Sequence, residues 1–215
     1  MLKWIDNFKE IDNLIFWDIG ANIGLYSIYN ALKNKTSTTI SFEPSTSNLR
    51  CLSRNISINS LQNKIKVFSL PLTNTENKFF IMNESYFNEG GALNTFGRDY
   101  NFEGKTFKPE MKYQLLGTTI NYLLDSKILD VPDYIKIDVD GIEHLILEGS
   151  NKYLANKKIK SIIVEINENF TEQYKKVLDI MKKNDFKILN KGLNLEASSK
   201  RSVKFQKMSN YIFIR

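Results

Sequence analysis

The most informative segment of the chain reads Phe16-Trp17-Asp18-Ile19-Gly20-Ala21-Asn22-Ile23-Gly24. It contains the end of a short apolar run, Leu14 to Trp17, then an acidic residue and a turn with two glycines; a helical pattern follows over Ile23 to Leu32. Glycine lets the backbone turn tightly and approach a ligand without a Cβ in the way. The helix start adds free N–H groups at the carboxyl end of the strand. The segment therefore predicts an α/β sheet with a ligand crevice at this edge.

Apolar runs and helical patterns alternate along most of the rest of the chain. Further strands are predicted at Thr38 to Phe42, Ile65 to Leu70, Tyr134 to Val139 and Ser161 to Ile166. Helices are predicted at Ser45 to Ile58, Thr118 to Leu124, Gly141 to Leu154 and Thr171 to Lys183. Because the strands are continuously apolar, we expect a mostly parallel sheet with helices on both faces. Two last strands, Phe186 to Leu189 and Tyr211 to Ile214, predict an antiparallel hairpin at one sheet edge. The whole chain, 1–215, is expected to form one domain.

The middle of the chain departs from this alternation. Strands are predicted at Lys78 to Met82 and Met111 to Leu116, and they flank a polar, aromatic and glycine-bearing segment, 83–110. A segment of this length without regular structure is usually a functional loop or lid. A β-hairpin extension of the sheet with a flexible tip explains the pattern equally well, so both interpretations stay open.

Composition narrows the class of protein. The chain has 215 residues, 42% of them hydrophobic, which is enough for one domain with a buried core. Its net charge of +6 comes from lysines spread along the sequence, which favours a solvated surface over a nucleic-acid site. One cysteine, Cys51, and one histidine, His144, exclude an intrachain disulfide and a Cys/His zinc site. With no signal peptide and no transmembrane run, we expect a cytoplasmic setting.

The glycine turn itself separates two classes of cofactor. A dinucleotide site requires G-x-G-x-x-G, but Asn22 stands in place of the middle glycine, and Asp18 precedes the turn. A carboxylate at this crevice repels a pyrophosphate and attracts a cation. S-adenosylmethionine carries a sulfonium and an ammonium group and no phosphate, so the segment favours it over NAD. An acidic cap on a tight turn would explain Asp18 alone but not the complete segment.

A second carboxylate supports this interpretation. Phe42-Glu43-Pro44 ends the second predicted strand. The Glu43 carboxylate offers two acceptor oxygens for the two hydroxyls of a ribose, and Pro44 restricts the turn that follows.

A third informative segment reads Tyr134-Ile135-Lys136-Ile137-Asp138-Val139-Asp140-Gly141-Ile142-Glu143-His144. It brings three carboxylates and the histidine to the end of one strand, where α/β sheets usually carry their chemistry. A divalent metal held by the three carboxylates is one alternative. We prefer an acidic cap favoured by the helix dipole, and predict no metal.

Together these segments resemble the FkbM-type methyltransferase family. The resemblance rests on the segments 17–27, 42–44, 136–143 and 161–166, which occur in the expected order. The family commonly has Asp-Val-Glu-Gly where this chain has Asp-Val-Asp-Gly, and many relatives have a longer N-terminal region that helps to form the acceptor pocket. The resemblance implies a Rossmann-like class I sheet that binds S-adenosylmethionine. It also implies methyl transfer to an oxygen, typically a hydroxyl of a sugar, glycan or secondary metabolite.

The resemblance also implies roles for individual residues. The predicted cofactor site comprises Asp18, Gly20, Ala21, Asn22, Gly24, Glu43, Pro44, Leu72 and Asp138. The predicted catalytic residues are Asp138, Asp140, Glu143 and His144, with Glu165 at the end of the adjacent strand. Histidine has the most suitable intrinsic pKa for a general base, but a single histidine in a first helical turn is more often a supporting residue. The identity of the base therefore stays open.

Two other functions remain as alternatives. The first is a methyltransferase acting on RNA or protein; however, the Asn/Asp-Pro-Pro-aromatic signature of base-amino methylation is missing, as is a basic helix with interleaved aromatics. The second is a non-catalytic cofactor-binding scaffold subunit. The segment from Lys191 to Lys207 carries five basic residues and one acidic residue, and it could dock a phosphate-bearing acceptor. A solvated loop that protects a sheet edge is the preferred interpretation, and we expect no nucleic-acid partner.

Overall fold

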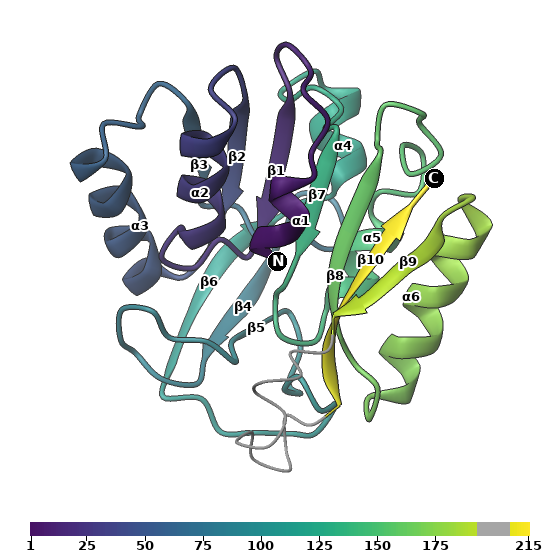
Figure 1. Ribbon diagram of the computed structural model, residues 1–215. Coiled ribbons are helices and arrows are strands. Elements are labelled where there is room, and N and C mark those ends of the chain that lie inside the picture. Colours follow the sequence, from purple (N-terminus) through teal and green to yellow (C-terminus); the bar gives the residue numbers. More distant parts are fainter. Residues whose placement is uncertain (193–206) are drawn as a thin grey trace.

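The computed structural model describes residues 1–192 and 207–215, and the strands of these residues form two sheets (Figure 1). The strands of the larger sheet are β1 (Ile15–Ile19), β2 (Thr38–Phe42), β3 (Ile65–Phe68), β7 (Tyr134–Ile137), β8 (Ser161–Asn167), β9 (Lys187–Gly192) and β10 (Met208–Ile214). The strands of the smaller sheet are β4 (Lys78–Glu84), β5 (Thr95–Phe96) and β6 (Met111–Gly117). The helices are α1 (Leu2–Asp6), α2 (Leu25–Lys33), α3 (Thr46–Ile58), α4 (Ile120–Asp125), α5 (Glu143–Glu148) and α6 (Thr171–Lys183).

The larger sheet has the strand order β3-β2-β1-β7-β8-β10-β9. Neighbouring strands from β3 to β8 are parallel, whereas β10 runs antiparallel to both β8 and β9. The predicted α/β fold with an antiparallel C-terminal hairpin at one edge is thus confirmed. β9 forms that edge, and residues 193–206 of the predicted basic segment lie outside the described residues.

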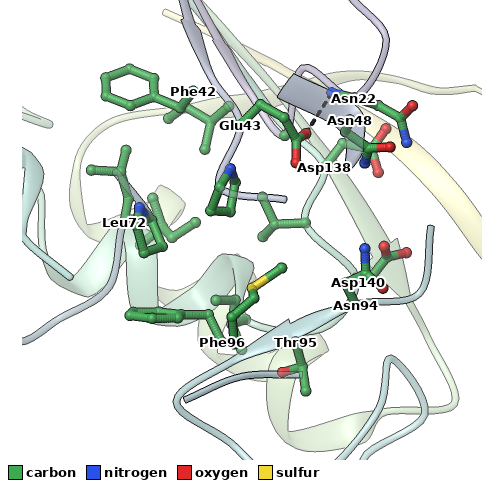
Figure 2. Close-up of a pocket in the computed structure, with 18 of the residues that line it drawn as sticks. Asn22, Phe42, Glu43, Asn48, Leu72, Asn94, Thr95, Phe96, Asp138 and Asp140 are labelled. Carbon is green, nitrogen blue, oxygen red and sulfur yellow. Dashed lines mark hydrogen bonds between the residues drawn. The ribbon is translucent and has the colours of Figure 1, made fainter. Parts of the chain in front are cut away.

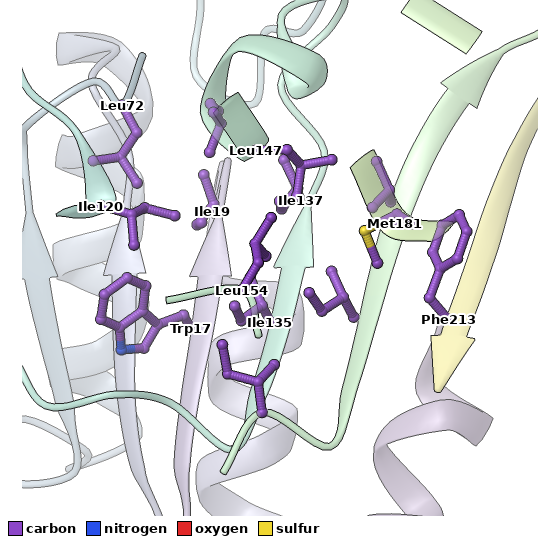
Figure 3. Close-up of a cluster of buried hydrophobic side chains, with 14 of the residues drawn as sticks. Trp17, Ile19, Leu72, Ile120, Ile135, Ile137, Leu147, Leu154, Met181 and Phe213 are labelled. Atoms are coloured by element: carbon purple, nitrogen blue, oxygen red, sulfur yellow. The ribbon is translucent and has the colours of Figure 1, made fainter. Parts of the chain in front are cut away.

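Side chains alternate between the two faces of this sheet, so each strand contributes to two clusters. On one face, Trp17 and Ile19 of β1 pack in a large core with α4, α5 and α6 (Figure 3). On the other face, Phe16 of β1 packs with aromatic residues of α1 and α2. Both faces are therefore covered, as the continuous apolar strands predict.

Helix α1 is missing from the prediction because its five residues carry no capping motif. Packing holds it in place. Trp4 is buried, its ring meets Phe8 edge-on, and its Nε1 donates a hydrogen bond to the Ser161 hydroxyl at 2.9 Å. A helix this short depends on tertiary contacts rather than on propensity, so the sequence pattern alone does not reveal it.

The predicted helix from Gly141 to Leu154 is too long, since α5 ends at Glu148. The reason lies at Gly149, where a Cβ would lie 2.2 Å from the Thr73 carbonyl oxygen. The chain passes close to a neighbouring loop at this glycine and continues in turns, in which the Ser150 hydroxyl donates to the Leu147 carbonyl.

The middle segment contains the predicted pair of strands, but in a separate sheet. β4 and β6 pair antiparallel from Lys78 to Glu84, and the short strand β5 adds to the other edge of β4. The hairpin therefore does not extend the larger sheet. Instead it lies beside the carboxyl ends of β1 and β2, where residues of β4 and β5 face Ile19 and Phe42 across a pocket. None of the helices in residues 1–192 and 207–215 is long and apolar enough to cross a membrane.

Candidate functional site

A pocket opens between the carboxyl ends of β1, β2 and β7 and the strands β4 and β5 of the smaller sheet (Figure 2). It is lined by Ile19, Gly20, Asn22, Phe42, Glu43, Pro44, Asn48, Leu70, Pro71, Leu72, Met82, Gly91, Asn94, Thr95, Phe96, Asp138, Val139, Asp140, Ile142 and Ile146. Figure 2 shows the polar residues Glu43 and Asp138 on one side, and Leu72 and Phe96 on the other. The pocket thus has a polar end and an apolar end.

Gly20 makes the closest backbone approach in the site. It has a φ of +78°, and a Cβ at this position would lie 1.9 Å from the carbonyl oxygen of Asp138. Only glycine fits here, because both its conformation and its contact exclude a side chain. The N–H of Gly20 donates to the Phe42 carbonyl at 3.0 Å, which ties the turn to the end of β2 as well.

Glu43 receives hydrogen bonds from two backbone segments. Its Oε2 accepts from the Asn22 N–H at 2.7 Å and its Oε1 accepts from the Ser45 N–H at 2.9 Å. Burial raises the pKa of Glu43, and these hydrogen bonds oppose the shift. The Asn48 side chain contributes a further hydrogen bond, and the remaining lone-pair capacity of the carboxylate can accept from a ligand hydroxyl.

Asp18 lies behind the pocket wall rather than in it. It is completely buried, its Oδ2 accepts from the Ser27 hydroxyl at 2.6 Å, and its Oδ1 lies 3.0 Å from the Lys136 ammonium nitrogen. The same nitrogen donates to the Gly20 carbonyl at 2.8 Å. Asp18 therefore acts on the glycine turn through Lys136, and the cation that it meets belongs to the protein.

Lys136 is a site residue that the sequence analysis missed. Burial alone lowers its pKa, but the carboxylates of Asp18 and Asp138 outweigh that effect and raise the pKa. The signal available in the sequence is a lysine in an otherwise apolar strand, next to an acidic strand end.

The remaining predicted cofactor residues divide into two groups. Pro44 and Leu72 line the pocket, with Phe42 and Leu70 nearby, and together they offer a slot for a flat apolar ring. Ala21 and Gly24 do not line it. Ala21 packs against Leu52 of α3, and Gly24 precedes α2 with a φ of +91°. These two residues belong to the turn but lie away from the pocket.

Asp138 and Asp140 both line the pocket. The Asp138 side chain is 25% exposed, so it remains accessible to a ligand. Asp140 adopts a φ of +61°, and its Oδ2 accepts from the Leu93 N–H at 2.6 Å. Burial, and next the charge of Asp138, raise the pKa of Asp140 to about 7, although hydrogen bonds from the backbone oppose this shift.

The structure does not bring Glu143 and His144 into the pocket. Glu143 is buried and accepts hydrogen bonds from the N–H groups of Val139 and Gly141, as well as from the Gln173 amide. Burial raises its pKa to about 8. Glu143 therefore holds the loop between β7 and α5, as an acidic cap would.

His144 is also buried, and its ring meets Phe170 edge-on. Burial, with a smaller contribution from Lys176, lowers the pKa of His144 to about 4, so the ring is neutral at physiological pH. Within the described residues, no three His, Cys, Asp or Glu side chains are grouped so that they could hold a metal ion.

The segment 85–94, which connects β4 to β5, contributes Gly91 and Asn94 to the pocket lining. The carbonyl oxygen of Gly91 accepts from the side-chain amides of Asn22 and Asn48, both at 3.0 Å. Asn48 also accepts from the Gly90 N–H at 2.9 Å. These contacts join residues distant in sequence, so no local motif could predict them. They fasten part of the predicted substrate loop to the cofactor pocket.

The strand order and the pocket at the carboxyl ends of the parallel strands define the fold of a class I methyltransferase. Residues 18–188 match the methyltransferase FkbM domain, and the chain belongs to this family. The family resemblance drawn from the sequence is therefore confirmed. No curated protein matches the chain.

Solved structures show the same fold at low sequence identity. A methyltransferase FkbM from Methylobacillus flagellatus KT superposes with a TM-score of 0.61 at 15% identity, covering 97% of this chain and 44% of that protein. A precorrin-6y C5,15-methyltransferase from Geobacter metallireducens GS-15 gives a TM-score of 0.55 at 11% identity, covering 100% and 85%. An rRNA methylase from Streptococcus thermophilus gives 0.53 at 11% identity, covering 95% and 87%. This chain thus spans less than half the length of the FkbM protein.

Membership of this family implies S-adenosylmethionine as the cofactor. The pocket fits that molecule, because it combines an apolar slot at Leu72 with a carboxylate at Glu43 and a glycine cradle at Gly20. These residues would hold the adenine, the ribose and the methionine part, respectively. When bound, the cofactor supplies an electrophilic methyl group.

Proposed function

We propose that this chain transfers the methyl group of S-adenosylmethionine to a hydroxyl oxygen of a sugar, glycan or small metabolite. The observation that supports this most directly is Asp138, a partly exposed carboxylate in the pocket wall against the glycine turn. A hydroxyl is too weakly acidic to ionise freely, and a positioned base contributes about 10²–10⁴ in rate. Holding the hydroxyl in line with the methyl group lowers the barrier by roughly 7–11 kcal/mol.

The charge of the pocket favours such an acceptor over a nucleic acid. Glu43, Asp138 and Asp140 all line it, whereas no lysine or arginine of the described residues does. A phosphate backbone would meet repulsion there, since nucleic-acid sites depend on cationic side chains. A neutral polyol meets no such penalty, and its hydroxyls can donate to the carboxylates.

The first experiment is calorimetric titration with S-adenosylhomocysteine, using the wild-type chain, Glu43→Ala and Glu172→Ala. The Glu172 side chain is 64% exposed on α6, so its replacement is the control. We expect binding that Glu43→Ala weakens and Glu172→Ala leaves unchanged. Absence of binding by well-folded wild-type protein would contradict the proposal and favour the scaffold alternative.

The second experiment uses cofactor with a labelled methyl group and separate pools of glycans, small hydroxylated metabolites, RNA and protein. Label in a hydroxyl acceptor, lost in Asp138→Asn, supports the proposal. Label in RNA or protein alone would overturn it.

A further inference from the structure

The register of β7 and β8 places two carboxyl groups side by side at the ends of these strands. Ile137 pairs with Val164, so the next residues, Asp138 and Glu165, are direct neighbours on parallel strands. Both side chains point to the sheet face that carries α2, because side chains alternate along a strand. The two carboxyl groups lie close enough for one to donate a hydrogen bond to the other.

Such a hydrogen bond requires a proton, because ionised carboxylates only accept. Lys136 decides which residue holds it. Its ammonium nitrogen lies 3.8 Å from Asp138 Oδ2 and places a positive charge beside that carboxylate. Burial, followed by the charge of Asp138, raises the pKa of Glu165 well above its usual range. Glu165 is therefore the residue of the pair that carries the proton.

The surroundings of this pair are mainly acidic and aromatic. Tyr26 of α2 lies close to the pair. The Lys136 ammonium lies 5.4 Å from the centre of the Tyr26 ring. Burial raises the pKa of the Tyr26 hydroxyl, and the charges of both carboxyl groups act in the same direction. Among the described residues, the other ionisable groups whose charges act on this pair or on its neighbours are Asp18, Lys136, Asp140 and Glu143. Lys136 is the single cation of this set, and Asp18 already partners it.

We propose that Asp138 and Glu165 act together as the general base of the methyl transfer, sharing one proton until the cofactor binds. The inference rests on the proposed function. Glu165 releases the shared proton when a sulfonium charge enters the pocket, which leaves two carboxylates ready to accept. As the acceptor oxygen bonds to the methyl carbon, the S–CH₃ electron pair returns to sulfur and the hydroxyl proton moves to the pair. The pair is then protonated again beside a neutral product, so atoms and charge balance.

The proposal predicts a difference between two ligands of the same shape. S-adenosylmethionine carries the sulfonium and S-adenosylhomocysteine does not. Calorimetry at pH 7 in buffers of different ionisation enthalpy should show release of about one proton per S-adenosylmethionine and none with S-adenosylhomocysteine. Glu165→Gln, which keeps a hydrogen-bond donor toward Asp138, should abolish that release while S-adenosylhomocysteine still binds. The infrared difference spectrum between the wild type and this variant should also show the loss of one protonated carboxyl band, while the bands of other protonated carboxyl groups such as Glu143 remain.

Asp140→Asn is the matched control, because Asp140 lies in the same pocket and its pKa is about 7. If Glu165 is the source of the proton, Asp140→Asn should still release it when S-adenosylmethionine binds. Release that vanishes in Asp140→Asn and survives in Glu165→Gln would overturn the inference, as would equal release with both ligands. If neither ligand binds the wild-type chain, the proposed function itself fails and the inference falls with it.

Discussion

Replacement of Lys136 by methionine tests the charged centre of the site. The Lys136 side chain is 3% exposed, and its ammonium nitrogen contacts Asp18 Oδ1 at 3.0 Å and the Gly20 carbonyl oxygen at 2.8 Å. Methionine fills the volume of the lysine stem but supplies no charge and no donor. The variant therefore leaves the buried Asp18 carboxyl without its cationic partner, with the Ser27 hydroxyl as its remaining hydrogen-bond partner.

The expected loss of stability is large. Removal of one partner from a buried ion pair costs about 3–5 kcal/mol, because the other charge stays desolvated. In a protein of this length each kcal/mol lowers Tm by about 2–4 °C, so Lys136→Met should melt roughly 6–20 °C below the wild type. Urea unfolding should report the same loss as a lower midpoint with an unchanged slope.

A double variant isolates the electrostatic cause. Asp18→Asn removes the buried charge and keeps an oxygen that can accept from Ser27. Lys136→Met combined with Asp18→Asn should therefore be more stable than Lys136→Met alone, with a coupling energy of roughly 0.5–3 kcal/mol.

Lys152→Met provides the surface comparison. Lys152 pairs with Asp125 at 2.5 Å, but its side chain is 61% exposed, so its loss should cost about 1 kcal/mol or less. Equal stability of Lys136→Met and Lys152→Met would refute the reasoning. So would a double variant less stable than Lys136→Met.

Three further results follow from the site. Gly20→Ala should weaken calorimetric binding of S-adenosylhomocysteine by about tenfold or more, because the new Cβ would lie 1.9 Å from the Asp138 carbonyl at a φ of +78°; wild-type affinity would contradict this. Asp140 has a folded pKa of about 7, above its ordinary value of 3.8, so the native state binds more protons and stability should fall as pH rises through this interval. Urea unfolding of Asp140→Asn should show a shallower decline, and an equal slope would argue against it. Asn48→Ala removes both of its hydrogen bonds to the segment 85–94, so amide hydrogen exchange there should accelerate, whereas unchanged protection would mean that other contacts hold the segment.

The sequence predicts those features that arise within short segments. The turn from Asp18 to Gly24 and the acid at Glu43 are recognisable because each joins a buried strand to a turn of restricted geometry. The parallel pairing in this half of the sheet follows from the alternation of continuously apolar strands with helices. The C-terminal hairpin is predictable because its two strands follow one another in the sequence as a pair.

What the sequence does not reveal depends on long-range contacts. Asn48 belongs to a helix whose sequence is typical of a surface helix. Its side-chain amide nevertheless donates a hydrogen bond to the carbonyl oxygen of Gly91, which lines the pocket. Glu143 and His144 follow the strand end as catalytic residues would, but α5 turns both into the interior. Burial and pairing are decided by packing of segments far apart in the chain, which a local pattern does not contain.

The sequence favours a cationic cofactor on the basis of Asp18, but Asp18 does not line the pocket. The acid before the glycine turn suggests a site for a cation, but the register of β1 and β7 sets Asp18 beside Lys136, and the two charges offset each other inside the sheet. The negative charge that faces the pocket comes from Glu43, Asp138 and Asp140 instead. A pyrophosphate would still be repelled and a sulfonium still attracted, because the part of the pocket lining that the structure describes holds carboxylates and no basic side chain. The preference for a cationic cofactor over a dinucleotide therefore survives the reassignment, and Glu43→Gln should weaken S-adenosylmethionine binding more than Asp18→Asn does when both variants are folded.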